Sequence, residues 1–282
     1  MIKLFVTDLD GTLLNRWHIA DKAINSGVKQ LKSRDYLFAV ATGRHLRRHQ
    51  RMGLSFLKDT DYFICMNGSL VLDNKGQVIH QTLIAPDQVQ ALIQAFPAIS
   101  FEVLTKDGIH VLSTARDHFR KGYQGNLTAK NLSRASLNRL LGGFFYQKSL
   151  DQISQLQVLK LECITNRPED KLALIDYLDS NKDALSYAYN DQVHFEITAS
   201  GANKKEGVLH LIKHLGLHPD QVAVYGNDTN DVEMLDYFTH SYAVEDAKEP
   251  AKAAAKTVLP DLGQTSVIGH MLETVKHQDA YR

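Results

Sequence analysis

The chain opens with a short apolar run that ends in acidic residues, Leu4-Phe5-Val6-Thr7-Asp8-Leu9-Asp10-Gly11-Thr12. The apolar stretch from Ile2 to Val6 is too short for a helix, so it predicts a buried strand. In open α/β sheets, ligands bind beyond the carboxyl ends of the strands, which is where Asp8 and Asp10 stand. Gly11 allows the backbone to turn sharply after them. This stretch therefore predicts a buried strand with a candidate ligand site at its carboxyl end.

Similar apolar runs recur along the chain, and each ends in small or polar residues. They are Tyr36 to Ala41 before Thr42-Gly43-Arg44, Tyr62 to Met66 before Asn67-Gly68, and Val222 to Tyr225 before Gly226-Asn227-Asp228. Apolar residues at helical spacing lie between them, at 21–31 and 208–215. Apolar strands that alternate with helices predict a Rossmann-like parallel sheet with helices on both faces.

The middle of the chain has a different pattern. Strand-like segments flank Thr105-Lys106-Asp107-Gly108 and Asn190-Asp191-Gln192, and each pair of segments predicts a hairpin with antiparallel strands. We therefore expect an inserted α+β domain at residues 84–195. Residues 1–83 and 196–282 would then form one discontinuous α/β core.

The composition of the chain excludes several classes of binding partner. The chain has 282 residues, with 32 Lys and Arg against 32 Asp and Glu, so its formal net charge is zero. Non-specific electrostatic binding to nucleic acid or to an acidic membrane requires an excess of basic residues, which the chain lacks. Its apolar runs are far shorter than the ~20 residues that cross a bilayer. Asp8 interrupts any signal-peptide core. Cys65 and Cys163 stand in apolar surroundings, which predict buried reduced thiols, and a disulfide between the two is the alternative. We expect a cytoplasmic protein with no membrane or nucleic-acid partner, and no pattern indicates its oligomeric state.

The two carboxylates at the first strand suggest specific chemistry. Close carboxylates repel unless a cation or a shared proton relieves them. The pair suits a hard cation such as Mg²⁺, and it also suits one nucleophile with one proton shuttle. The alternative is a surface turn with two solvated acids, which the preceding strand and the following Gly11-Thr12 disfavour.

These residues resemble motifs of the haloacid dehalogenase (HAD) superfamily of phosphohydrolases. Asp8 to Thr12 resembles the first motif, Thr42 in Ala41-Thr42-Gly43-Arg44 the second, Lys204 the third, and Gly226 to Asp231 the fourth. Asn67-Gly68 fits a pattern of the Cof-type branch, subfamily IIB. The resemblance implies a Mg²⁺-dependent phosphatase of small phosphorylated metabolites, with sugar phosphates first and nucleotides or flavin mononucleotide next. The inserted domain would be a cap that selects the substrate.

The resemblance also implies roles for individual residues. Asp8 would attack phosphorus to form an aspartyl-phosphate, while Asp10 would first protonate the leaving group and then deprotonate water. The residues implied to bind phosphate are Thr42, Gly43, Lys204 and Asn230, with Arg44 and Asn67 near the substrate. The residues implied to hold the metal are Asp8, the backbone carbonyl of Asp10, Asn227 and Asp231.

Two departures from the family pattern leave alternatives open. Asn227 stands where the family usually has an aspartate, so Asp228 is an alternative metal ligand. Lys205 directly follows Lys204 and is the alternative lysine for binding phosphate. A phosphomutase of the same superfamily is a second interpretation. A regulator that binds phosphorylated metabolites without catalysis is a third, and Asn227 alone favours it. In the inserted domain, Tyr187, Tyr189 and His194 would either line a substrate pocket or lie on a sheet face.

Overall fold

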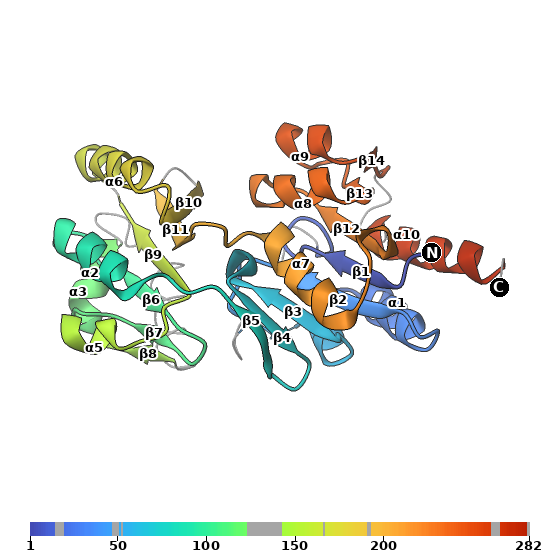
Figure 1. Cartoon of the computed structure of the whole chain (residues 1–282), viewed down its shortest axis with the longest axis horizontal. Coiled ribbons are helices and arrows are strands. Elements are labelled where there is room, and N and C mark those ends of the chain that lie inside the picture. The colour runs from blue at the N-terminus through green and yellow to red at the C-terminus, as the bar shows by residue number, and fades with distance from the viewer. Residues whose placement is uncertain are drawn as a thin grey trace. The chain divides into compact units, whose positions relative to one another are not determined.

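The protein is described by a computed structural model in which the chain divides into two compact units (Figure 1). One unit comprises Met1–Gln81 and Asn203–Arg282, and the other comprises Thr82–Ala202. The structure describes residues 1–14, 20–46, 51, 53–122, 143–165, 167–190, 193–260 and 266–280.

The first unit is built on a sheet whose strands are mostly parallel. Its strands, in spatial order, are β14 (Thr257–Val258), β13 (His240–Ala243), β12 (Val222–Gly226), β1 (Leu4–Thr7), β2 (Leu37–Ala41), β3 (Tyr62–Cys65), β4 (Leu70–Asp73) and β5 (Val78–Gln81). The strands from β14 to β3 run parallel, while β4 and β5 are antiparallel additions at one edge. Since β1 lies between β12 and β2, the ends of these three strands meet at one place.

Helices cover both faces of this sheet, which confirms the predicted fold class. They are α1 (Lys22–Lys32), α7 (Lys204–Leu215), α8 (Val232–Tyr237), α9 (Glu249–Ala254) and α10 (Ser266–Asp279). Short 3₁₀ turns are η2 (Ser55–Lys58), η3 (Met66–Gly68), η4 (Pro219–Gln221) and η5 (Thr229–Asp231). Helix α1 packs against α10, and α7 packs against α8 on the opposite face (Figure 1). Asp21 caps α1 by accepting the N–H of Ile24.

The second unit has its own sheet and core. The strands, in spatial order, are β10 (Leu185–Asn190), β11 (His194–Ala199), β9 (Lys160–Ile164), β6 (Glu102–Leu104), β7 (Ile109–His110) and β8 (Phe144–Phe145). The helices are α2 (Pro86–Ala95), α3 (Ala115–Gly122), α5 (Leu150–Ser154) and α6 (Pro168–Ser180). Both expected hairpins are present, as β6–β7 and β10–β11.

The structure refines the expected organisation. The second unit extends to Ala202 rather than to residue 195, because β11 pairs with β10 as far as Ala199. The edge hairpin β4–β5 is an element that the strand pattern missed. Tyr187 stacks on Phe195 and Tyr189 lies tilted beside it, and the Phe195 side chain belongs to the apolar core of this unit. They are sheet-face residues, whereas His194 lies 3.6 Å from the carboxylate of Glu162.

Two expectations from composition concern burial. No helix in the described part of the chain is long and apolar enough to cross a membrane. Cys65 and Cys163 are both free thiols and both buried, as their apolar surroundings predicted. Burial raises the pKa of the Cys65 thiol to about 12.

The turn after β3 packs tightly against the start of α7. Met66, Asn67 and Gly68 all have positive φ, at 50°, 54° and 95°. A Cβ atom on Gly68 would collide with the main-chain carbonyl of Asn203, the residue that caps α7. Glycine at this position therefore lets the first residues of α7 approach the ends of the strands.

Gly68 tests this packing, with Gly76 as a matched control. Gly76 also has positive φ, at 80°, but its Cβ would enter open space. We expect Gly76→Ala to lower the free energy of unfolding by about 1–2 kcal/mol, which is the cost of a left-handed conformation. Gly68→Ala adds overpacking, so its loss should exceed the control's by a further ~1–3 kcal/mol. Denaturant unfolding measures both, and equal losses would contradict the tight approach of α7.

Candidate active site

Asp8 lies at the carboxyl end of β1, between the ends of β12 and β2. Its N–H still donates to the carbonyl of Tyr225 in β12, at 2.9 Å, so the backbone at Asp8 continues the sheet. The residue is only 5% exposed. The strand therefore holds this carboxylate in a fixed and largely dry position.

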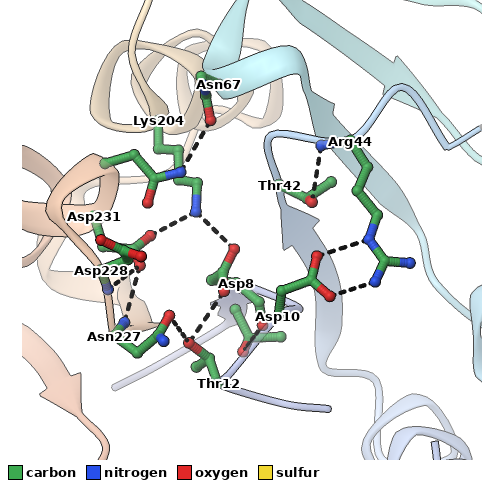
Figure 2. A network of polar contacts seen from close by, with 12 residues as sticks. Asp8, Asp10, Thr12, Thr42, Arg44, Asn67, Lys204, Asn227, Asp228 and Asp231 are labelled. Carbon is green, nitrogen blue, oxygen red and sulfur yellow. Dashed lines mark hydrogen bonds and ion pairs between the residues drawn. The ribbon is translucent and has the colours of Figure 1, made fainter. Parts of the chain in front are cut away.

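Lys204 brings a positive charge to this carboxylate. It is the first residue of α7, and its Nζ donates to Asp8 Oδ1 at 2.6 Å and to Asp231 Oδ1 at 2.7 Å (Figure 2). Its side chain is fully buried. Burying an ammonium group is costly unless carboxylates compensate its charge. The two aspartates provide that compensation, so all three groups are held together.

Asp231 also organises the loop that follows β12. Its Oδ2 accepts the main-chain N–H groups of Asn227 at 2.9 Å and of Asp228 at 3.0 Å. Both of its oxygens therefore accept hydrogen bonds from the protein. Asp231 fixes the position of Lys204 and the course of this loop at once.

Thr12 links Asp8 to Asn227, and sequence reasoning did not assign it a role. Its Oγ1 lies 3.2 Å from Asp8 Oδ2 and 3.0 Å from Asn227 Oδ1 (Figure 2). The close approach of Asn227 depends on Gly11, since a Cβ there would collide with Asn227 Nδ2. The Gly-Thr pair was noted in the sequence, and it was the available signal for this contact.

Asp10 points to a different partner. Arg44 donates through Nε to Asp10 Oδ2 at 2.7 Å, and its Nη2 donates to Asp10 Oδ1 (Figure 2). The Asp10 side chain is 33% exposed and the Arg44 side chain 20%. Asp8 and Asp10 thus have separate cationic partners, which reduces the repulsion between them.

The remaining expected residues frame the site. Thr42 follows β2, is buried, and accepts the N–H of Arg44 through Oγ1 at 3.1 Å. Gly43 lies between these two and is half-buried. Asn230 Nδ2 donates to Asn67 Oδ1 at 3.1 Å, which joins the loop after β12 to the turn after β3. Asparagine tolerates the left-handed backbone that Asn67 adopts.

Lys205 and Asp228, the alternative site residues, have other partners in the structure. Lys205 pairs with Glu206 at 3.0 Å and does not take the place of Lys204. Asp228 caps η5 by accepting the N–H of Thr229, and it pairs with Lys248 at 2.7 Å. In this arrangement Asn227, rather than Asp228, has its side-chain oxygen beside the Thr12 hydroxyl, which also contacts Asp8.

Burial also changes protonation at the site. Burial raises the pKa of Asp8 to about 7 against the opposing ammonium of Lys204, and the carboxylate of Asp231 adds to the rise. Burial alone would lower the pKa of Lys204, but the carboxylates of Asp231 and Asp8 raise it above its ordinary value. Lys204 is therefore charged at neutral pH, while Asp8 needs a further cation to be fully ionised.

The donor chemistry fits a hard divalent cation. Among the described residues, no three acidic, histidine or cysteine side chains converge to hold a metal by themselves. Mg²⁺ usually keeps several waters and takes only one or two protein carboxylates. The oxygens gathered at this point are those of the Asp8 carboxylate, the Thr12 hydroxyl and the Asn227 amide. This set suits Mg²⁺ better than a softer metal.

Comparisons with known proteins show which family the chain resembles. The family model for haloacid dehalogenase-like hydrolases matches residues 5–272. HMP-PP phosphatase from Enterobacter sp. (strain 638) is 28% identical over 284 residues, covering 98% of this chain and 94% of that protein. The HMP-PP phosphatase from Serratia proteamaculans (strain 568) is also 28% identical, with 96% and 91% covered.

Solved structures share the fold. A haloacid dehalogenase-like hydrolase from B. subtilis matches with a TM-score of 0.77 at 22% identity, covering 96% of this chain and 99% of that one. A HAD subclass IIB sugar phosphatase matches with a TM-score of 0.74 at 19% identity, covering 96% and 98%. The family match spans both sequence segments of the first unit and the whole of the second. The chain therefore belongs to the haloacid dehalogenase-like hydrolases.

Proposed function

We propose that this protein is a Mg²⁺-dependent phosphatase of the Cof-type branch that hydrolyses small phosphorylated metabolites through an aspartyl-phosphate on Asp8. The observation that carries the proposal is the buried contact of Asp8 with Lys204, which Asp231 holds in place. This contact puts a carboxylate and a fixed positive charge at one strand end, as in-line attack on a phosphoryl group requires. The name phosphatase, which two full-length relatives carry, supports the same reaction class.

In the first step, an oxygen of Asp8 bonds to phosphorus as the bond from phosphorus to the leaving oxygen breaks. Asp10 donates a proton to that oxygen, so an alcohol departs rather than an alkoxide. The ammonium of Lys204 and the hydroxyl of Thr42 would bind the phosphoryl oxygens, where negative charge persists throughout the transfer.

In the second step, water attacks the phosphorus atom of the aspartyl-phosphate. Asp10, now ionised, takes the proton from that water, and the bond between phosphorus and Asp8 breaks. Phosphate leaves, and both carboxylates return to their first state. A phosphomutase would differ only here, by passing the phosphoryl group to a second sugar hydroxyl.

The residues proposed to hold Mg²⁺ are Asp8, the main-chain carbonyl of Asp10, and Asn227, with Asp231 fixing the loop. When bound, the ion supplies positive charge that offsets the repulsion between Asp8 and a phosphoryl dianion. Asn227 contributes an oxygen without a charge, so the protein has one carboxylate fewer at this position than an aspartate would give. The second unit, Thr82–Ala202, is proposed to act as a cap that selects among sugar phosphates, nucleotides and similar metabolites.

Asp8→Asn tests the nucleophile without changing the size of the side chain. Phosphate release from p-nitrophenyl phosphate and from a metabolite panel should fall by about 10³-fold or more, as expected when an essential nucleophile is lost. EDTA should abolish release by the unchanged protein. Release that persists in Asp8→Asn, with an unchanged thermal midpoint, would refute the assignment, and tight binding without any release would favour the regulator.

Mg²⁺ binding should release a proton below about pH 7. The free protein holds a proton on Asp8 up to that pH, because its pKa is raised to about 7, and a metal ligand must be ionised. Affinity should therefore rise with pH and level off above about 7. Calorimetry in two buffers of different ionisation enthalpy measures the proton release. Asp8→Asn should remove it, and binding without proton release would contradict this view of Asp8.

Asn227→Asp tests whether residue 227 is a metal ligand, and Asp228→Asn is its control. If residue 227 is a ligand, a carboxylate there should lower the Mg²⁺ concentration for half-maximal activity by about tenfold. Asp228→Asn removes a nearby charge that pairs with Lys248, and it should leave this concentration within about twofold. A response to Asp228→Asn alone would instead make Asp228 the ligand.

A further inference from the structure

A serine, a histidine and a glutamate of the second unit form a chain of hydrogen bonds that the proposed phosphatase reaction does not use. Ser100 Oγ lies 2.8 Å from Nδ1 of His118, and Nε2 of His118 lies 3.0 Å from Oε1 of Glu102. Glu102 is the first residue of β6, and His118 reaches both partners from α3. A nucleophile, a base and a group that orients the base are thus each within hydrogen-bond reach of the next.

The carboxylate decides where the protons of this chain lie. An ionised Glu102 can only accept a hydrogen bond, so Nε2 of His118 carries a proton and donates it to Glu102. In the neutral imidazole, Nδ1 then has an unprotonated lone pair, and the hydroxyl of Ser100 donates to it. The Ser113 hydroxyl, 3.2 Å from Ser100 Oγ, is then the donor to that oxygen. The imidazole can therefore take the Ser100 proton, as a general base does.

The residues around His118 hold its ring in place. The carbonyl of Thr114 accepts the N–H of His118 at 2.9 Å, and Thr114 Oγ1 accepts the N–H of Asp117 at 3.1 Å, which fixes the first turn of α3. The rings of Phe144 and Tyr146 lie 6.3 Å and 6.2 Å from the imidazole. The His118 side chain is 15% exposed. Protein therefore surrounds most of the base, while a part of it still meets solvent.

Glu102 also supplies negative charge beside the imidazole. It lies directly opposite Glu162 in the register of β6 and β9. Like charges that face each other across a sheet are unfavourable unless cations compensate them. Lys160 pairs with Glu162 at 2.6 Å, and His118 pairs with Glu102 at 3.0 Å. A carboxylate thus stabilises the imidazolium that forms when Ser100 loses its proton.

We propose that Ser100 and His118 form a second catalytic site, which transfers the acyl group of carboxylic esters to water, with Glu102 as its positioning residue. Ser100 Oγ bonds to the carbonyl carbon of the ester and passes its proton to Nδ1 of His118. The bond from that carbon to the leaving oxygen then breaks, and an alcohol departs with the proton. Water attacks the acyl-serine and gives a proton to Nδ1, a carboxylic acid leaves, and Ser100 recovers that proton.

The neighbouring rings indicate the class of ester. Phe144 and Tyr146 are stacked, with their centroids 5.7 Å apart, beside the proposed base. Aromatic rings bind apolar and aromatic groups by burying their surface. Esters with a short apolar acyl chain or an aromatic leaving group are therefore the expected substrates.

Covalent labelling of the unchanged protein tests the nucleophile. A fluorophosphonate probe bonds to an activated serine oxygen through phosphorus as fluoride leaves, and peptide mass spectrometry identifies the modified residue. We expect the label on Ser100, and no label after the protein has been denatured. The absence of label, or a label on Ser113 instead, would overturn the proposal.

Hydrolysis of p-nitrophenyl acetate and p-nitrophenyl butyrate is the second measurement. Ser100→Ala should lower kcat/KM by about 10²-fold at an unchanged thermal midpoint, because base-assisted attack is lost. Ser154→Ala is the matched control, since this hydroxyl of the same unit donates to the carbonyl of Asp151. It should change kcat/KM by less than about twofold. A rate that Ser100→Ala leaves unchanged would overturn the proposal.

Two further arms separate this site from a structural network and from the phosphatase site. Glu102→Gln keeps an oxygen acceptor but removes the charge, so kcat for the esters should fall about tenfold with KM unchanged, and Glu102→Asp should restore part of the loss. An unchanged kcat would overturn the role of Glu102. EDTA should abolish phosphate release but leave ester hydrolysis unaffected. Ester hydrolysis that EDTA also abolishes would belong to the site of Asp8 and would overturn the second site.

Discussion

The buried ammonium of Lys204 between Asp8 and Asp231 is the interaction on which the site depends. It joins three segments that are far apart in sequence: the end of β1, the start of α7, and the turn η5. None of these charges can be buried alone without a large desolvation cost. The carboxyl end of β1 and the start of α7 are therefore tied together by the site itself, and glycine at position 68 allows α7 to approach the strand ends.

The site has two sides with separate charge partners. On one side, Asp8 contacts Lys204 and Thr12, and Asn227 brings an uncharged oxygen. On the other side, Asp10 contacts Arg44. Two carboxylates separated by one residue repel each other, and each here has its own cationic partner to offset that repulsion. The separate partners suit the proposed roles, in which Asp8 acts on phosphorus and Asp10 on the leaving group.

Much of the fold could be predicted from the sequence because its main signals are local. The buried strands β1, β2, β3 and β12 are short apolar runs with polar ends, and Asp21 is a standard helix cap. The hairpin β4–β5 was missed because β5 is exposed or half-buried and lacks a continuous apolar pattern. The end of the second unit was placed too early because a strand's last residues depend on its partner.

The sequence motifs pointed to Asp8, Lys204 and Asp231 as candidate site residues, but they did not predict how these side chains would touch. The structure places the ammonium of Lys204 in contact with both carboxylates. Sequence spacing did not decide which of Lys204 and Lys205 lies at the site. Their surroundings distinguish them, because Lys204 is buried while Lys205 pairs with Glu206. The pairing of Arg44 with Asp10 depends on how β2 ends beside β1, which only the folded chain defines.

The most direct test of the account is to quench the protein with acid during turnover and to map phosphorylated peptides by mass spectrometry. The account predicts a phosphoryl group on Asp8 that is lost in hydroxylamine and that disappears once substrate is exhausted. Turnover with no modified peptide, or with the phosphoryl group on another residue, would contradict it.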